Sequence, residues 1–282
     1  ATTGASIGTA TIQYNNCSSN NVYYITDATS DGDGTVWMTS FYTSTTYAAI
    51  TKWSVTYTSN ANGQIISTYK CEQSWSVLEV GGISIDPSTN DMYVVQRTRQ
   101  SSSYDMDLWK VSRSHPNIAV QTWSLGTISP SGGFSNLNSY VRPAGLDVHM
   151  PRISVNVHCY HYAYTYYCDT DRVSWMNVYH QRSNWPELQG EYSSPYAIMG
   201  IENIDGELAT TCLYGTTTSY CPSATTLRKI KMRGNGAADW MGTPSATSAT
   251  ITSSTQTLVR SISELSIGVA VTWESTGTSI DF

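Results

Sequence analysis

Residues Gly82 to Ser112 read GISIDPSTNDMYVVQRTRQSSSYDMDLWKVS and show the clearest strand pattern of the chain. A turn cluster, DPSTN, follows the first apolar run, because proline fixes φ and Asn and Asp tolerate left-handed backbone. The polar segment Arg97–Asp107 follows the second run, and we expect it to be a loop. The stretch therefore predicts three consecutive antiparallel strands. The three apolar runs are Ile83–Ile85, Met92–Val95 and Leu108–Val111.

The same unit of strand, turn, strand, loop and strand recurs at intervals of roughly 55 to 65 residues, usually with a fourth strand. The C-terminal copy lacks its fourth strand, and Ala10–Tyr14 could supply it. Repeated four-stranded units without helical periodicity predict an all-β fold, a five-bladed β-propeller of four-stranded antiparallel blades in a single domain, residues 1–282. A pair of β-sandwiches or a jelly roll remains the alternative, since its turns are similarly spaced. The expected blades are 20–74, 75–135, 136–193, 194–250, and 251–282 together with 1–18.

Two strands at the limits of these copies have weaker patterns. The first blade is expected to begin with Val22–Thr26, followed by a turn rich in Gly and Asp. The fourth blade is expected to end with a strand around Ala238–Met241, inside a segment rich in Ser, Thr and Gly. Both strand predictions rest on the repeat more than on a local alternation of apolar and polar residues.

The best copy resembles a known kind of blade. Gly82-Ile-Ser-Ile-Asp86-Pro, Met92-Tyr-Val-Val95 and Leu108-Trp-Lys-Val111 are similar to a blade of the NHL or SMP-30-like propellers, in which a Gly-Ile strand ends in Asp and a turn. The resemblance covers one blade well and implies a propeller fold. No set of Glu, Asn and Asp positions here matches the metal site of the SMP-30 lactonases, so the resemblance implies no activity.

Composition excludes two classes of partner. Charged residues make up 13% of the chain and the net charge is −6, so nothing provides the basic surface that a nucleic acid requires. No run of 18 apolar residues is present, so we expect no membrane span. Many Ser and Thr residues, and a start at Ala1, lead us to expect a mature, secreted, extracellular glycoprotein.

Six cysteines also indicate an oxidising compartment. Two pairs have the same spacing, each enclosing a polar, Tyr-rich segment between strand-like runs, and by elimination the remaining two would pair, although six cysteines allow 15 pairings. Metal-type Cys-x-x-Cys spacing is absent. Asn16 begins the one N-x-Ser/Thr glycosylation signal, a weak one because a cysteine stands in its middle position. The expected disulfides are Cys159–Cys168, Cys212–Cys221 and Cys17–Cys71.

The chain holds 20 Tyr against 3 Phe, and many of the tyrosines lie between the second and third strands of the copies. In a propeller these connections emerge on one face, while the Asp-containing turns lie on the other. Tyrosine presents a flat apolar ring and a hydroxyl group, which suits the apolar faces and hydroxyl edges of sugars. Alternating tyrosines could instead pack between strands. The predicted glycan-binding residues are Tyr42, Tyr47, Tyr104, Tyr160, His161, Tyr162, Tyr164, Tyr166, Tyr214 and Tyr220.

The leading hypothesis is therefore a lectin-like, non-enzymatic propeller that binds glycans or glycoprotein surfaces and needs no cofactor. A second is a structural subunit of an extracellular fibre or coat, in which the strand Ala10–Tyr14 completes the open blade of a neighbouring copy. A third is a polysaccharide-degrading enzyme: a lyase that uses Tyr160, His161 and Arg172, or a glycoside hydrolase with paired carboxylates. The acids expected near the axis are Glu79, Asp147, Glu202 and Glu264.

Calcium is the one cofactor with a candidate site. Asp27, Asp31 and Asp33 gather carboxylates around one predicted turn, as calcium loops do. An ordinary turn explains the same residues, because Asp stabilises turns through its own backbone.

Overall fold

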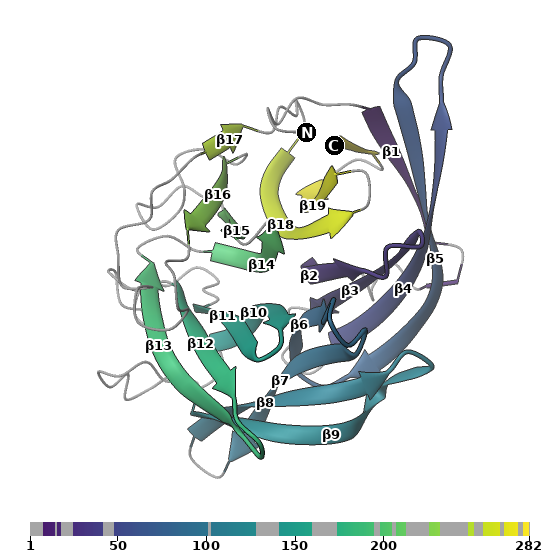
Figure 1. Ribbon diagram of the computed structural model, residues 1–282. Helices are drawn as coiled ribbons and strands as arrows, with labels where there is room; N and C mark the ends of the chain where they lie inside the picture. Colours follow the sequence, from purple (N-terminus) through teal and green to yellow (C-terminus); the bar gives the residue numbers. More distant parts are fainter. Residues whose placement is uncertain are drawn as a thin grey trace.

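The computed structural model is an assembly of β-sheets, and its described residues contain strands and turns but no helix (Figure 1). No helix there could cross a membrane. The structure describes residues 8–14, 16–17, 25–41, 48–100, 103–127, 141–159, 174–194, 198–204, 207–212, 226–231, 248–250, 256–265, 268–275 and 279–281.

The best-described sheets each take four consecutive strands in chain order. Sheet one contains β2 (Ile25–Ser30), β3 (Thr35–Phe41), β4 (Ala48–Ser59) and β5 (Ile65–Val77). Sheet two contains β6 (Val80–Ile85), β7 (Met92–Gln100), β8 (Ser103–Ser112) and β9 (His115–Thr127). Sheet three contains β10 (Val141–His149), β11 (Arg152–Cys159), β12 (Ser174–Gln181) and β13 (Pro186–Ser194).

The C-terminal part of the chain repeats the pattern with shorter strands. Sheet four contains β14 (Ile198–Ile204), β15 (Glu207–Cys212), β16 (Thr226–Lys231) and β17 (Ser248–Thr250). A further pair contains β18 (Gln256–Leu265) and β19 (Gly268–Ser275), and the last strand is β20 (Ser279–Asp281).

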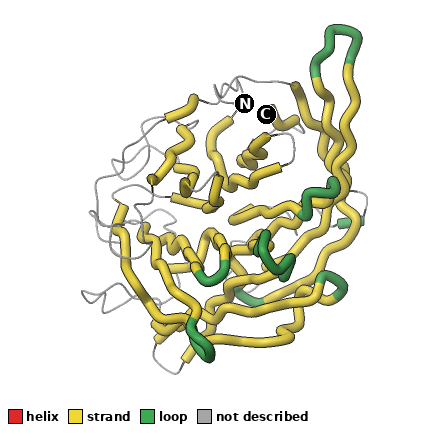
Figure 2. The backbone as a smooth tube through the Cα atoms, viewed as in Figure 1, coloured by secondary structure: helices red, strands yellow, loops and turns green. Residues whose placement is uncertain are grey.

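The first strand of each group lies toward the middle of the molecule (Figures 1 and 2). Neighbouring first strands pack side by side: β2 with β6, β6 with β10, β10 with β14, β14 with β18, and β18 with β2. The fourth strands β9 and β13 lie at the periphery. The sheets therefore radiate from a set of central strands.

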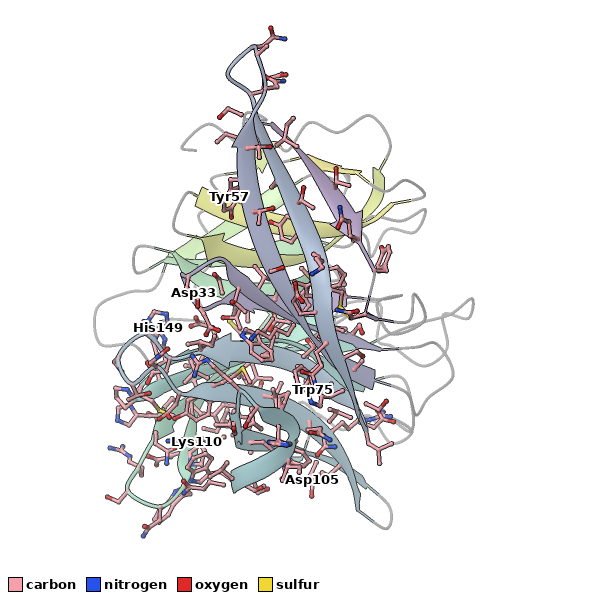
Figure 3. The ribbon with its side chains drawn as sticks, turned by 90° about the vertical axis from the view of Figure 1, so that its right-hand side faces the viewer. Asp33, Tyr57, Trp75, Asp105, Lys110 and His149 are labelled. Atoms are coloured by element: carbon pink, nitrogen blue, oxygen red, sulfur yellow. A yellow bond between two sulfur atoms is a disulfide. The ribbon has the colours of Figure 1, made fainter. Side chains whose placement is uncertain are left out.

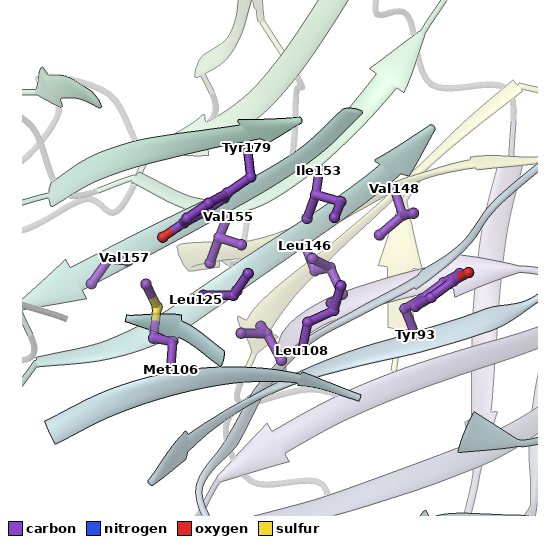
Figure 4. Close-up of a cluster of buried hydrophobic side chains, with 11 residues drawn as sticks. Tyr93, Met106, Leu108, Leu125, Leu146, Val148, Ile153, Val155, Val157 and Tyr179 are labelled. Carbon is purple, nitrogen blue, oxygen red and sulfur yellow. The ribbon is translucent and has the colours of Figure 1, made fainter. Parts of the chain in front are cut away.

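Alternation along β7 explains how the sheets stack. Successive side chains of a strand point to opposite faces. Met92 and Val94 join a buried cluster with Trp37 and Ile50 of sheet one. Tyr93 and Val95 join the cluster against sheet three shown in Figure 4, together with Met106, Leu108, Leu125, Leu146, Val148, Ile153, Val155, Val157 and Tyr179. Sheet two is consequently buried on both faces.

Two glycines allow the central strands β6 and β10 to approach closely. A Cβ atom on Gly81 would lie 1.8 Å from the carbonyl oxygen of Pro143. A Cβ atom on Gly82 would lie 2.8 Å from the backbone of Gly145 and Leu146. Only glycine fits where two backbones come this near.

The N-terminal strand joins its own chain. β1 (Gly8–Gln13) pairs in parallel with β5, with Ile12 opposite Tyr69, and antiparallel with β20, with Thr9 opposite Asp281. The Cys17–Cys71 disulfide lies just beyond the end of this ladder and confirms that predicted pairing. The pairing of β1 with the last strand is as expected, but through β5 both strands belong to sheet one, and no described ladder joins them to β18 and β19. Completion of the last blade by β1 therefore stays a prediction, and the pairing with β5 is an addition that the repeat does not predict.

Several predicted boundaries are wrong. The first strand of sheet one is Ile25–Ser30, so Asp27 lies within a strand and not at a turn. The expected loop Arg97–Asp107 is largely a ladder that continues to Gln100 opposite Ser103, because polar side chains can occupy paired strands when their partners satisfy them. The last strand of sheet four is Ser248–Thr250. The expected strand Ala238–Met241 lies outside the described residues.

Candidate functional site

A buried carboxylate connects three of the central strands. Asp27 in β2 is fully buried, and its Oδ2 accepts backbone hydrogen bonds from Ile83 of β6 at 3.0 Å and Leu146 of β10 at 2.7 Å. No described strand pairs with the inner edges of β6 and β10, and Asp27 satisfies two of their N–H groups. It therefore links sheets one, two and three.

Hydroxyl groups continue this arrangement along the same strands. Thr29 Oγ1 accepts a hydrogen bond from the Ile85 N–H at 3.3 Å, and Ser84 Oγ accepts one from the Val148 N–H at 3.0 Å. Thr29 and Ser84 are both buried. Polar side chains thus accept hydrogen bonds from the N–H groups of Ile85 and Val148 on the inner edges of β6 and β10.

A second carboxylate lies near the first. Asp147 in β10 is buried, with its Oδ1 3.5 Å from His149 Nε2 and its Oδ2 3.6 Å from an Arg152 terminal nitrogen. Burial raises the pKa of Asp27 well above its usual value, the backbone N–H donors oppose this, and the negative charge of Asp147 adds to it. Neither carboxylate is accessible to a substrate in this structure, since Asp27 is 0% and Asp147 1% exposed.

The other acids expected near the axis lie on or beside other central strands. Glu79 precedes β6 and pairs with the buried Arg97 at 2.7 Å, away from Asp27. Glu202 and Glu264 lie in the central strands β14 and β18. The negative charge of Asp147 acts on Asp27.

The three aspartates of the calcium candidate do not come together. Asp27 caps strand edges as above, while Asp31 accepts hydrogen bonds from Trp37 Nε1 at 2.9 Å and Arg113 Nε at 2.8 Å. Asp33 accepts the Thr35 N–H at 2.9 Å, which lowers the pKa of Asp33, and so it stabilises its own turn. Among the described residues no group of three His, Cys, Asp or Glu side chains could hold a metal ion.

The short turns between first and second strands form one face, which we call the turn face. Asp86 is buried there and accepts hydrogen bonds from Ser88 and Thr89. Arg113 donates to Asn90 and to Asp31, joining the turns of sheets two and one. These contacts stabilise the Asp86-Pro87 turn and join the turn of sheet two to that of sheet one.

Figure 3 shows that the molecule has two distinct faces. Asp33, Lys110 and His149, all near short turns, lie on one side of it. Asp105 and Trp75 lie on the other side, near the connections between second and third strands. Trp75 marks the first of these, because it lies opposite Ile50 near the start of β4.

Most of the predicted glycan-binding residues lie outside the described residues, so their arrangement remains a prediction. Tyr104 is in β8, opposite Arg99. Cys159 and Cys212 end β11 and β15, while their predicted partners Cys168 and Cys221 are not described. Asn16 is exposed beside the bonded Cys17, and its glycosylation remains a prediction. The residues outside the described ranges are Tyr42, Tyr47, Tyr160, His161, Tyr162, Tyr164, Tyr166, Tyr214 and Tyr220.

Sequence reasoning missed the central role of Asp27. A signal was available: Asp27 stands among residues with strand propensity, Ile25-Thr26-Asp27-Ala28-Thr29, before the Gly/Asp turn begins. A buried acid in the middle of a strand requires hydrogen-bond partners.

Comparisons with known proteins show distant likenesses of fold. No protein-family model matches the chain, and no curated protein sequence matches it. An α-L-arabinofuranosidase from Lactobacillus brevis is similar with a TM-score of 0.46 and 10% identity, over 89% of this chain and 83% of that one. A putative oxidoreductase (glucose dehydrogenase) from Thermus thermophilus has a TM-score of 0.37 and 10% identity, over 90% and 91%. A subtype N10 neuraminidase-like protein of A/little yellow-shouldered bat/Guatemala/060/2010 has a TM-score of 0.39 and 10% identity, over 92% and 83%.

Proposed function

We propose that this chain is a secreted, five-bladed β-propeller that binds glycans without modifying them. In this proposal the central strands β2, β6, β10, β14 and β18 form a closed ring. β1 completes the last blade through β20, and the blades follow the boundaries expected from the repeat. The contacts between successive central strands, including β18 with β2, support ring closure.

The observation that carries the binding proposal is which strands flank the Tyr-rich segments along the chain. Residues 42–47, 160–173 and 213–225 each join a second strand to a third strand, in sheets one, three and four respectively. Antiparallel sheets that share a direction at their central strands direct these connections to one side, opposite the turn face. Tyr, Ser and Thr side chains gathered there would provide stacking surfaces and hydrogen bonds for sugar rings.

The surroundings of the buried acids favour binding over hydrolysis. Asp27 and Asp147 have partners within the protein and are inaccessible, so neither can protonate a glycosidic oxygen or activate water as arranged. A glycosidase would need two accessible carboxyl groups separated by a fixed distance. The Cys17–Cys71 disulfide is typical of an oxidising compartment, which supports secretion.

A glycan array with matched variants tests this function. We expect the natural chain to bind a defined subset of glycans, and the double variant Tyr162→Ala/Tyr214→Ala to lose that signal by at least tenfold. Trp185→Ala is the control, because Trp185 is 58% exposed but lies in the turn between β12 and β13, which adjoins Pro151 on the turn face. An array without hits, or equal losses in the two variants, contradicts the proposal.

A further inference from the structure

The hairpin formed by β4 and β5 extends beyond the rest of sheet one as an arm (Figures 1 and 3). We define the arm as residues 55–69, with Val55 opposite Tyr69 and Ser59 opposite Ile65. Its turn is well fixed, because the Asn60 N–H donates to the Gln64 carbonyl and Asn60 Oδ1 accepts from the Asn62 and Gln64 N–H groups. The arm is therefore an ordered ribbon.

The two edges of the arm differ. β1 covers the β5 edge, from Gly8 opposite Ile65 to Gln13 opposite Lys70. On the β4 edge, pairing with β3 ends at Thr35 opposite Ser54, and the Val55 N–H donates to the Gly34 carbonyl at 2.7 Å. Beyond Val55, no described strand pairs with this edge.

The backbone groups on that open edge can be named from the alternation of an antiparallel ladder. The N–H and C=O of one residue point to the same edge, and successive residues alternate between edges. Since the Val55 N–H points away from β5, those of Tyr57 and Ser59 do so too. Thr56, Tyr57, Thr58 and Ser59 are all exposed, so this edge of the arm lies at the surface.

Nothing in the sequence of the arm blocks a further strand. Native edge strands are commonly protected by Lys, Pro, a bulge or an inward-pointing charge. The segment VTYTSNANGQIIS, residues 55–67, contains no charged residue and no proline, in a chain whose net charge is −6. Two copies of this segment would meet without charge repulsion, whereas two copies of the acidic molecule would otherwise repel one another.

We propose that the arm is a homodimerisation site at which the β4 edges of two copies pair antiparallel about a twofold axis. The open backbone groups favour a register centred on Thr58. An axis at Tyr57 would require Val55, whose N–H is already bound to Gly34. An axis at Thr58 pairs Tyr57 with Ser59 of the second copy through two hydrogen bonds and repeats this on the other side of the axis.

The resulting dimer is a continuous sheet of arms. Its order is β1, β5, β4, then β4, β5, β1 of the second copy. The Thr58 residues of the two copies form a non-hydrogen-bonded pair, whose Cα atoms lie about 4.5 Å apart. This inference is independent of glycan binding. If both hold, two binding faces in one particle would increase avidity for a glycan-coated surface.

Analytical ultracentrifugation of the full chain and two lysine variants tests the dimer. We expect the natural chain to dimerise at micromolar concentrations. Thr58→Lys, which sets two ammonium groups opposite each other at the axis, should raise the dimer dissociation constant at least tenfold, and less in high salt. Asn62→Lys at the tip of the arm is the matched control and should leave the constant within threefold. A natural chain that stays monomeric up to about 1 mM overturns the proposal. Equal changes of the dimer dissociation constant in Thr58→Lys and Asn62→Lys also overturn it.

Cysteine crosslinking tests the register separately. Thr58→Cys should form a disulfide-linked dimer under mild oxidation, because the cysteines of a non-hydrogen-bonded pair lie within the Cα distance that a disulfide needs. Thr56→Cys is the control, since Thr56 would lie opposite Asn60 of the second copy and not opposite itself. Equal crosslinking of the two variants contradicts the proposed register, and its absence in both contradicts the interface.

Discussion

Asp27 shows how a single side chain can connect units far apart in the sequence. Its partners Ile83 and Leu146 are 56 and 119 residues away. Local sequence cannot reveal such contacts, because the N–H groups that Asp27 satisfies become neighbours only after the sheets have assembled. Asp86 behaves differently: its partners Ser88 and Thr89 are adjacent in the chain, and its turn could be predicted from sequence.

Replacing Asp27 separates its hydrogen-bonding role from its charge. Asp27→Ala leaves two buried N–H groups without their acceptor, so we expect the free energy of unfolding to fall by about 2–5 kcal/mol. Asp27→Asn retains an oxygen acceptor for both donors and should cost much less at neutral pH. Urea denaturation measures both variants, and equal losses would contradict this assignment.

The raised pKa of Asp27 predicts that the free energy of unfolding depends on pH, and Asp27→Asn is the variant that reveals it. The folded pKa of Asp27 is raised, so the folded state holds this proton more tightly than the unfolded chain, whose value is about 3.9. Stability contributed by Asp27 is therefore present at low pH and is lost as pH rises from about 4 through the raised pKa. The free energy of unfolding of Asp27→Asn relative to the natural chain should increase over that interval. Other acids cancel in the difference, and a flat difference curve would refute the prediction.

Gly81 is a second position at which one residue controls contact between sheets. A methyl group there would meet the Pro143 carbonyl at 1.8 Å, so Gly81→Ala should destabilise the protein by about 2–3 kcal/mol or more. Gly63→Ala is the control: its φ of +75° is unfavourable for alanine, but no atom lies within 4 Å, so the cost should be about 1 kcal/mol. Thermal unfolding ranks the two variants, and a reversed order would contradict the close approach of β6 and β10.

At the scale of elements, strand existence was easier to predict than strand limits. Sheet two follows the sequence pattern because its apolar residues alternate on two buried faces, as at Tyr93 and Val94. The ladder beyond Arg97 was mistaken for a loop because its stability depends on a distant partner: Glu79 neutralises Arg97, whose side chain is 2% exposed. The addition of β1 to β5 was missed for the same reason.

The N-terminal strand is held by its ladder and by one covalent bond. The Cys17–Cys71 disulfide closes a separation of 54 residues, so the double variant Cys17→Ala/Cys71→Ala should lose about 2–4 kcal/mol. We also expect faster amide exchange in Gly8–Gln13, because β1 can then separate from β5 without unfolding the sheet. Hydrogen exchange measures this directly, with β6 and β7 as the internal reference. Unchanged exchange in β1 would show that the ladder alone holds the strand.

At the scale of the molecule, the ends of the described chain meet in one sheet, because Thr9 pairs with Asp281 (Figure 1). A closed propeller needs this junction but does not need the chain to begin where it does. A circular permutant that joins the native ends and opens between Asn62 and Gly63, at the exposed tip of the arm, should therefore fold cooperatively. Its unfolding free energy in dilute solution should lie within about 2 kcal/mol of the natural value, since exposed tips tolerate such openings.

The matched permutant opened between Ser88 and Thr89 should be much less stable, because it cuts the turn around the buried Asp86. Circular dichroism during thermal unfolding compares the two. A first permutant that does not fold, or two permutants that unfold alike, would contradict this prediction.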